Sequence, residues 1–215
     1  MKIGVIQASS QSGKNGLLYQ LTAAAAAGGG HEVFNFGCFP EERKRYSYVD
    51  IALEAGLLLS AGAVDFIVTG CSSGQGMMLA CNSLPDMLCG YLPTPQDAFL
   101  FGRINGGNAA SLPLGLNYGW AGELNLQYTL EKLFDGPFGI GYPPGDAARK
   151  QRDAQQVKAL GRLTKRPALD VWRSLDQELV RRALSREIVA EYLLSCGTDR
   201  ELTAWIEIIC RREEE

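Results

Sequence analysis

The sequence has little histidine, no excess of positive charge and no long apolar run, and each shortage excludes a class of function. His31 is the single histidine among 215 residues, so acid–base catalysis cannot depend on a cluster of histidines. We expect His31 itself to be structural or exposed. The net charge of −3 argues against a surface for nucleic acid. No segment approaches the ~20 apolar residues of a membrane span, so we expect neither nucleic acid nor a membrane as partner.

The six cysteines show no C-x-x-C pair and no zinc-site spacing. The first residues, Met1–Ile6, read as a strand and lack the basic segment and apolar core of an export signal. We therefore expect a cytoplasmic protein whose cysteines stay reduced. Most of them should be small buried hydrophobic residues, an interpretation that covers Cys81, Cys89, Cys196 and Cys210.

Strand and helix patterns alternate through the first two thirds of the chain. The predicted strands are 2–7, 32–36, 65–69, 87–92 and 109–112, and the predicted helices include 16–27, 49–61, 95–103 and 120–134. This alternation predicts an α/β fold, with a parallel sheet of about five strands and helices on both faces. Ligands bind such sheets at the carboxyl ends of the strands. We therefore expect the site in the loops 8–15, 71–76, 92–96 and 104–108.

The character of the chain changes after a segment rich in Gly and Pro at 135–145. Charged helical patterns follow, with predicted helices at 146–163, 169–184, 185–196 and 199–212. We expect an α/β domain at residues 1–155 and a C-terminal helical extension at residues 156–215. The extension is short for an independent core, so it should dock on the α/β unit or on a partner subunit.

The segment Gly70–Gly76 carries the strongest functional signal. It follows the apolar, β-rich run Val64–Thr69 and precedes a helix start at Met77. A strand, a glycine-rich turn and a helix in this order form an anion cradle, because backbone N–H groups converge and the helix dipole adds positive charge. Cys71 stands at the mouth of this cradle, where it could act as a nucleophile or a base. The alternative is that Cys71 is a buried structural thiol.

Two motifs resemble those of the ribose-5-phosphate isomerase B / galactose-6-phosphate isomerase family. The family's Cys-Gly-Thr-Gly-x-Gly loop stands here as Cys71-Ser72-Ser73-Gly74-Gln75-Gly76, and Ala80-Cys81-Asn82 follows it. The family's His-Asn-x-x-Asn motif stands as Ile104-Asn105-Gly106-Gly107-Asn108. The resemblance covers residues 1–155, so the chain is similar to a longer subgroup that carries a C-terminal extension.

The resemblance implies a Rossmann-like subunit in a homodimer with shared active sites, or in a tetramer. It also implies aldose–ketose isomerisation of a sugar phosphate, of the ribose-5-phosphate/ribulose-5-phosphate type, with no metal or other cofactor. In this reading the catalytic residues are Cys71, which removes a proton beside the carbonyl, and Ser73, whose loop amides hold the enediolate. The implied substrate-binding residues are Ser9, Ser72, Gly74, Gln75, Gly76, Asn105, Arg149 and Arg152.

Three positions depart from the family's pattern. Ala8-Ser9 replaces an Asp-His pair, Ile104 replaces a histidine, and Gly115 falls near a common arginine. The missing groups open the sugar ring and help to bind phosphate, which leaves the ring-opening residue unassigned among Tyr91, Asp97 and Ser73. Arg103 could replace a lost cation, and the loop residues Ser9, Ser10, Ser12 and Lys14 could bind phosphate or hydroxyls. Ser9 and Ser10 could equally cap the first helix.

Two other readings remain open. The protein could bind a sugar phosphate without catalysis, having lost the ring-opening residues. Alternatively, the serine-rich first loop could belong to a flavin or phosphatase domain of similar topology. A Cys-x5-Arg phosphatase loop is excluded, because Met77 stands where the arginine would be.

Overall fold

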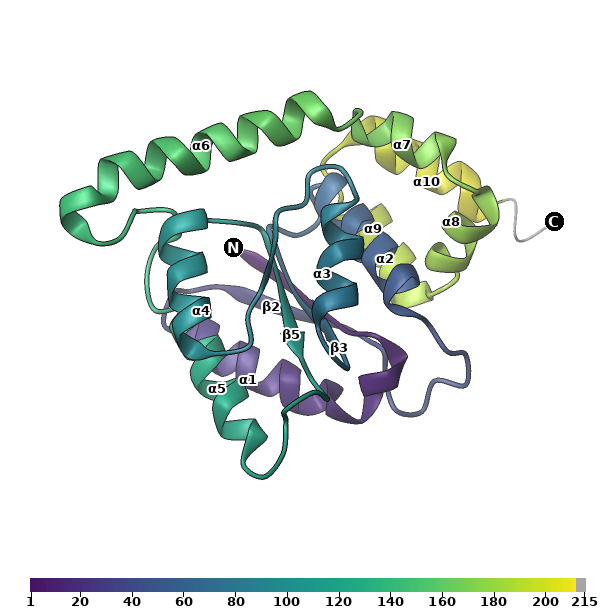
Figure 1. The fold of residues 1–215 in the computed structure, drawn as a ribbon. Helices are drawn as coiled ribbons and strands as arrows, with labels where there is room; N and C mark the ends of the chain where they lie inside the picture. Colours follow the sequence, from purple (N-terminus) through teal and green to yellow (C-terminus); the bar gives the residue numbers. More distant parts are fainter. Residues whose placement is uncertain (212–215) are drawn as a thin grey trace.

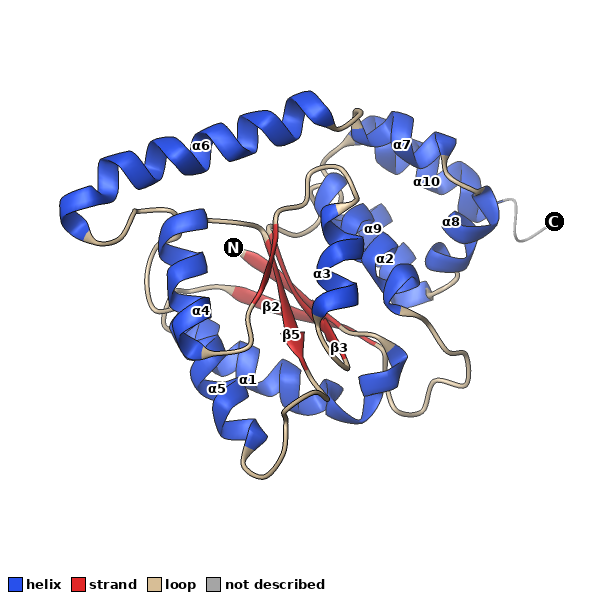
Figure 2. Ribbon diagram, in the orientation of Figure 1, coloured by secondary structure: helices blue, strands red, loops and turns tan. Residues whose placement is uncertain are grey.

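Five parallel strands form the centre of the fold, seen here in a computed structural model that describes residues 1–211 (Figures 1 and 2). The strands are β1 (Lys2–Ile6), β2 (Glu32–Gly37), β3 (Phe66–Cys71), β4 (Cys89–Tyr91) and β5 (Ala109–Pro113), in the order β2-β1-β3-β5-β4. All six residues of the central strand β3 are buried, as expected for a parallel strand covered on both faces. The predicted α/β fold is confirmed.

Helices cover both faces of the sheet (Figure 2). One face packs against α1 (Asn15–Ala27), α4 (Pro95–Leu100) and α5 (Gly122–Leu133), and the other against α2 (Tyr48–Ser60) and α3 (Gln75–Asn82). The neighbouring strands β1 and β3 therefore lead to helices on opposite faces. The crevice at the carboxyl ends of these two strands is the place where parallel sheets bind ligands.

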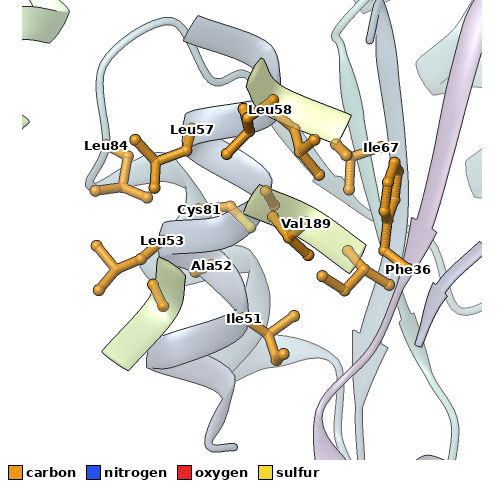
Figure 3. Packing of buried hydrophobic residues seen from close by; sticks show 14 of the residues in the cluster. Phe36, Ile51, Ala52, Leu53, Leu57, Leu58, Ile67, Cys81, Leu84 and Val189 are labelled. Carbon is orange, nitrogen blue, oxygen red and sulfur yellow. The ribbon is translucent and has the colours of Figure 1, made fainter. Parts of the chain in front are cut away.

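The C-terminal extension docks on α2, as one of the two sequence expectations had it. Its helices are α6 (Ala147–Thr164), α7 (Ala168–Ser174), α8 (Gln177–Leu184), α9 (Glu187–Cys196) and α10 (Arg200–Arg211). The indole of Trp172 in α7 is fully buried, and a Cβ on Gly56 of α2 would lie 3.0 Å from it. Figure 3 shows Val189 of α9 among buried side chains of α2, β2 and β3. The extension and the sheet thus share one hydrophobic core.

Helix α6 is the exception, since none of its 18 residues is buried. It runs along one side of the molecule, from the end that holds α4 towards α7 (Figure 1). Val157, Leu160 and Leu163 are 50%, 59% and 82% exposed. The expected boundary at residue 155 falls inside this helix.

Some predicted elements differ from the structure. The single helix expected at 169–184 is two helices, because the Asp176 side chain accepts a hydrogen bond from the Glu178 N–H and starts α8 there. The helix expected at 95–103 continues beyond α4 as a π-helical turn, Phe101–Asn105. The predicted end of the last helix at residue 212 lies outside the described residues. Within residues 1–211, no helix is long and apolar enough to cross a membrane.

The single histidine and the cysteines are placed mostly as expected. His31 Nδ1 lies 3.1 Å from the N-terminal amine near the surface, which is a structural role. Cys81 and Cys89 are buried, whereas Cys196 and Cys210 are only partly buried.

Candidate active site

Cys71 is the last residue of β3, and its thiol points into the turn that leads to α3. The side chain is 8% exposed, and the Gly74 N–H donates a hydrogen bond to Sγ at 3.2 Å. Gly74 has φ +76°, and a Cβ there would lie 2.9 Å from the main chain of Leu112 and Pro113. Only glycine fits this position, and its left-handed backbone conformation lets the Gly74 N–H face the sulfur.

The cysteine loop, residues 71–76, is anchored to the end of β5. The Ser72 carbonyl accepts hydrogen bonds from the N–H groups of Gly115 and Leu116 at 2.9 and 2.7 Å. The Ser111 hydroxyl donates to the Gly74 carbonyl at 2.6 Å. These contacts fix the position of the loop up to the start of α3. There the first amides of α3, at Gly76 and Met77, are not satisfied by helical hydrogen bonds.

The loop after β1 meets the cysteine loop, as the topology requires. The Gln11 side-chain amide donates to Ser72 Oγ at 2.9 Å, and Ser72 Oγ lies 3.4 Å from Ser10 Oγ. Lys14 Nζ donates to Gln11 Oε1 at 3.2 Å and lies 4.3 Å from the centre of the Tyr118 ring. Gln11 therefore links a cation to the mouth of the cysteine loop, a role that the sequence did not suggest.

Ser9 and Ser73 have their hydroxyls engaged by the backbone. Ser9 is 5% exposed, and its Oγ accepts from the Tyr46 N–H at 2.8 Å. Ser73 Oγ accepts from the Gln75 N–H at 3.3 Å. Helix α1 starts at Asn15 without a side-chain cap, so the idea that Ser9 or Ser10 caps it is wrong. Ser9 reaches Tyr46 instead because the loop after β2 lies against it.

Arg103 and Asp97 have structural roles. Arg103 is 3% exposed, and its guanidinium donates to the Leu133 carbonyl at 2.9 Å between the rings of Phe99 and Phe138. The idea that it replaces a lost substrate-binding cation is therefore wrong. Asp97 accepts the hydroxyl of Thr94 at 2.6 Å at the start of α4.

Asn105, Arg149 and Arg152 lie at the other edge of the sheet. Asn105 belongs to the π-helical turn before β5, so it sits near the amino ends of the strands, whereas Cys71 sits at a carboxyl end. The expectation that loop 104–108 joins the carboxyl edge is wrong, because that loop precedes its strand. Arg149 and Arg152 are exposed in α6, and Arg149 pairs with Asp146 and Asp153. One chain alone does not bring these three residues to Cys71.

Each edge of the sheet has a cavity. At the carboxyl edge, beside the cysteine loop, about 280 Å³ is enclosed by residues that include Tyr91, Leu112 and Tyr118. The buried Tyr118 hydroxyl has no hydrogen-bond partner among the described atoms. At the amino edge, about 770 Å³ lies between loop 106–108 and the end of α6, with Lys158 and Arg162 in its wall.

Two further features of the site escaped the sequence. The ring of Tyr48, which is 44% exposed, lies 3.5 Å from where a Gly76 Cβ would be, so it forms a wall beside the cysteine loop. No local pattern marks it, since the contact joins two separate strand–helix units. Within residues 1–211, no group of three or more His, Cys, Asp or Glu side chains is arranged to hold a metal ion.

The sequence of the chain is similar to that of a known protein family. A sequence model of the ribose/galactose isomerase family matches residues 10–122. No curated protein sequence matches the chain.

Solved structures resemble the chain over most of its length, as three of them show. The crystal structure of 4-deoxy-L-threo-5-hexosulose-uronate ketol-isomerase complexed with a tartrate is 38% identical, with a TM-score of 0.93 over 98% of this chain and 100% of that one. Ribose-5-phosphate isomerase LacAB_rpiB from Vibrio parahaemolyticus is also 38% identical, with a TM-score of 0.92 over 97% of this chain and 99% of that one. The type B ribose 5-phosphate isomerase of Trypanosoma cruzi is 17% identical and matches 75% of this chain over 98% of its own, with a TM-score of 0.60, which indicates a shared fold.

Proposed function

The chain belongs to the ribose/galactose isomerase family of sugar isomerases, and on that premise we propose that it interconverts an aldose and a ketose phosphate with Cys71 as the base. The substrate class is the ribose-5-phosphate/ribulose-5-phosphate type. The observation that carries the proposal is the pairing of the Cys71 thiol with the Gly74 amide at the carboxyl edge of the sheet. A cytoplasmic location fits a site that depends on a reduced thiol.

The proposed reaction passes through an enediolate. The Cys71 thiolate takes the proton from C2 of the open-chain aldose, and the electron pair of that bond forms the C1–C2 double bond while the carbonyl oxygen becomes an anion. The amides at the start of α3 would hold this oxygen. The thiol then returns its proton to C1, a proton passes from the C2 hydroxyl to the C1 oxygen, and a C2 ketone results.

A second copy of the chain would complete the site. Asn105, Arg149 and Arg152 were predicted as substrate ligands, yet they lie at the sheet edge opposite Cys71. In a homodimer in which the amino edge of one subunit faces the carboxyl edge of the other, the arginines would reach the phosphate and Asn105 a sugar hydroxyl. The exposed apolar side chains of α6 support such a dimer.

A second candidate substrate is a keto-uronate, whose acidic group is a carboxylate. It is favoured by the 38% identity to a hexosulose-uronate ketol-isomerase, and by Ile104 and Gly115 at positions where the phosphate-using family has a histidine and an arginine. Enediolate chemistry at Cys71 is the same for both substrates. They differ in the anion that must be bound and in the length and substituents of the carbon chain.

The test is an isomerase assay with purified protein across phosphorylated pentoses, phosphorylated hexoses and keto-uronates. Turnover of a pentose phosphate supports the proposal, and turnover of a uronate alone selects the second candidate. If no sugar is turned over but one raises the melting temperature, the protein binds a sugar without catalysis and the proposal fails.

A further inference from the structure

The end of α8 and the turn that leads to α9 contact the loop that follows β2, residues 38–47. Arg182 donates from Nη2 to the Arg45 carbonyl at 3.1 Å, and its Nε lies 3.1 Å from Asp50 Oδ1. Lys44 Nζ donates to Ser185 Oγ at 2.8 Å. The partners in these contacts are more than 130 residues apart in the sequence. The C-terminal extension therefore contacts the loop that follows β2 and the start of α2.

Arg186, the residue after Ser185, makes a buried contact with the same loop. It is 5% exposed, and its guanidinium donates to Glu54 at 2.6 Å and to Glu42 at 2.8 Å. The same group lies 5.2 Å from the centre of the Tyr46 ring. A buried guanidinium that donates to two acidic side chains has a fixed geometry, since any displacement would leave buried N–H groups without a partner.

Loop 38–47 also contacts the loop after β1, which borders the candidate active site. Tyr46 donates its N–H to Ser9 Oγ at 2.8 Å, and Ser9 returns its own N–H to the Tyr46 carbonyl at 3.1 Å. Arg45 Nη1 lies 3.5 Å from the Ser9 carbonyl oxygen. The next residues after Ser9 are Ser10 and Gln11, which contact Ser72 beside the reactive thiol.

Loop 38–47 has no helix or strand of its own, so long-range contacts must hold its shape. We propose that Arg182, Ser185 and Arg186 of the C-terminal extension are positioning residues for the isomerase site, which they order through loop 38–47, Ser9 and the cysteine loop. The effect on turnover rests on the proposed function; the ordering of the loop does not. In this proposal the extension packs on α2 and also orders the loops at the carboxyl ends of the strands.

The test compares Arg182→Ala with Arg181→Ala. Both residues are exposed on α8 and both changes remove one positive charge, but only Arg182 contacts loop 38–47. Amide hydrogen exchange should become faster in Arg182→Ala for the peptides that contain Ser9 and Tyr46. The value of kcat/KM should fall about tenfold, mainly through kcat, because small displacements of positioning groups misalign the substrate and the base. Arg182→Lys should recover a large part of this loss, and Arg181→Ala should match the wild type in both measurements.

Two results would overturn the proposal. One is equal exchange of those peptides in the two alanine variants, which shows that the extension does not order the loop. The other is faster exchange with unchanged kcat/KM, which shows that the ordered loop does not position the site. The exchange measurement needs no turnover, so a failure of the proposed isomerase activity would be recognised separately, by a wild type that isomerises none of the sugars.

Discussion

Glu54 is a carboxyl group in an unusual place, fully buried in α2 against Arg186. Burial raises its pKa from an ordinary value of 4.5 to about 8, although Arg186 acts in the opposite direction. Glu54 Oε1 has no hydrogen-bond partner among the described atoms, so Arg186 satisfies only the other oxygen of this carboxyl. The group therefore binds a proton more tightly in the folded state than in the unfolded one.

This difference predicts how stability depends on pH. Between pH 4.5 and about 8 the folded state holds a proton that the unfolded state has lost, so the free energy of unfolding falls as pH rises. The contribution of one such group is at most about 1.4 kcal/mol per pH unit. In urea unfolding at about pH 5.5 and about pH 7.5, the wild type should lose more stability than Glu54→Gln. Equal losses in the two proteins would contradict the assignment.

Single residues could be assigned from the sequence where their partners are local. Cys71 and Gly74 belong to one short strand–turn–helix segment, and that segment was predicted as a unit. The capping role of Ser9 and the substrate-binding role of Arg103 are wrong predictions because their partners, Tyr46 and Leu133, are 37 and 30 residues away. Burial of a polar side chain through such contacts leaves no periodic pattern in the sequence.

Helix α6 is the element whose surroundings within one chain are most incomplete. Leu160 and Leu163 project from a helix that buries none of its residues, and an exposed apolar stripe of this kind is typical of an interface. If α6 forms the interface of the proposed homodimer, Leu160→Asp should convert the dimer into monomers without unfolding the chain. Light scattering after gel filtration gives the mass, and circular dichroism checks the fold.

Gln155→Asp is the matched control, because Gln155 is exposed on the opposite side of the same helix. It should keep the wild-type mass. A monomeric wild type, or a Leu160→Asp variant that assembles normally, would remove α6 from the interface.

The elements themselves were largely predictable. Continuous apolar runs marked the strands, and alternation with helices implied their parallel arrangement. The break between α7 and α8 was missed because apolar residues continue at helical spacing across it, while the cap at Asp176 decides where the helix restarts. The edge that loop 104–108 occupies follows from strand direction, which the motif alone does not state.

At the scale of the whole molecule, the account requires that two subunits supply one site. Cys71→Ala and Arg152→Ala should each be inactive as pure proteins, since each lacks one half of every site. Co-expression of the two variants should restore turnover. In a random mixture half of the dimers are hybrids, and each hybrid has one site with both halves intact, so activity should reach about a quarter of the wild type.

Recovery of this size would be impossible if Cys71 and Arg152 acted in the same chain. A mixture as inactive as its components, with hybrid dimers confirmed by two affinity tags, would contradict the shared site. The family resemblance implies a shared site, whereas composition and spacing do not, because neither describes how two copies would face each other.

The central claim is that Cys71 moves a proton on the sugar. The most direct measurement follows candidate sugars by proton NMR in heavy water, with wild-type protein and with Cys71→Ala. We predict aldose–ketose interconversion, with solvent deuterium at the carbon beside the carbonyl because the Cys71 thiol exchanges its proton with the solvent before returning it. Both should fall by a factor of about 10² to 10⁴ in Cys71→Ala. Substrate binding to Cys71→Ala should persist in a thermal-shift measurement, because removing the base mainly affects the transition state. Interconversion at the wild-type rate in Cys71→Ala would show that another group is the base, and would contradict the account.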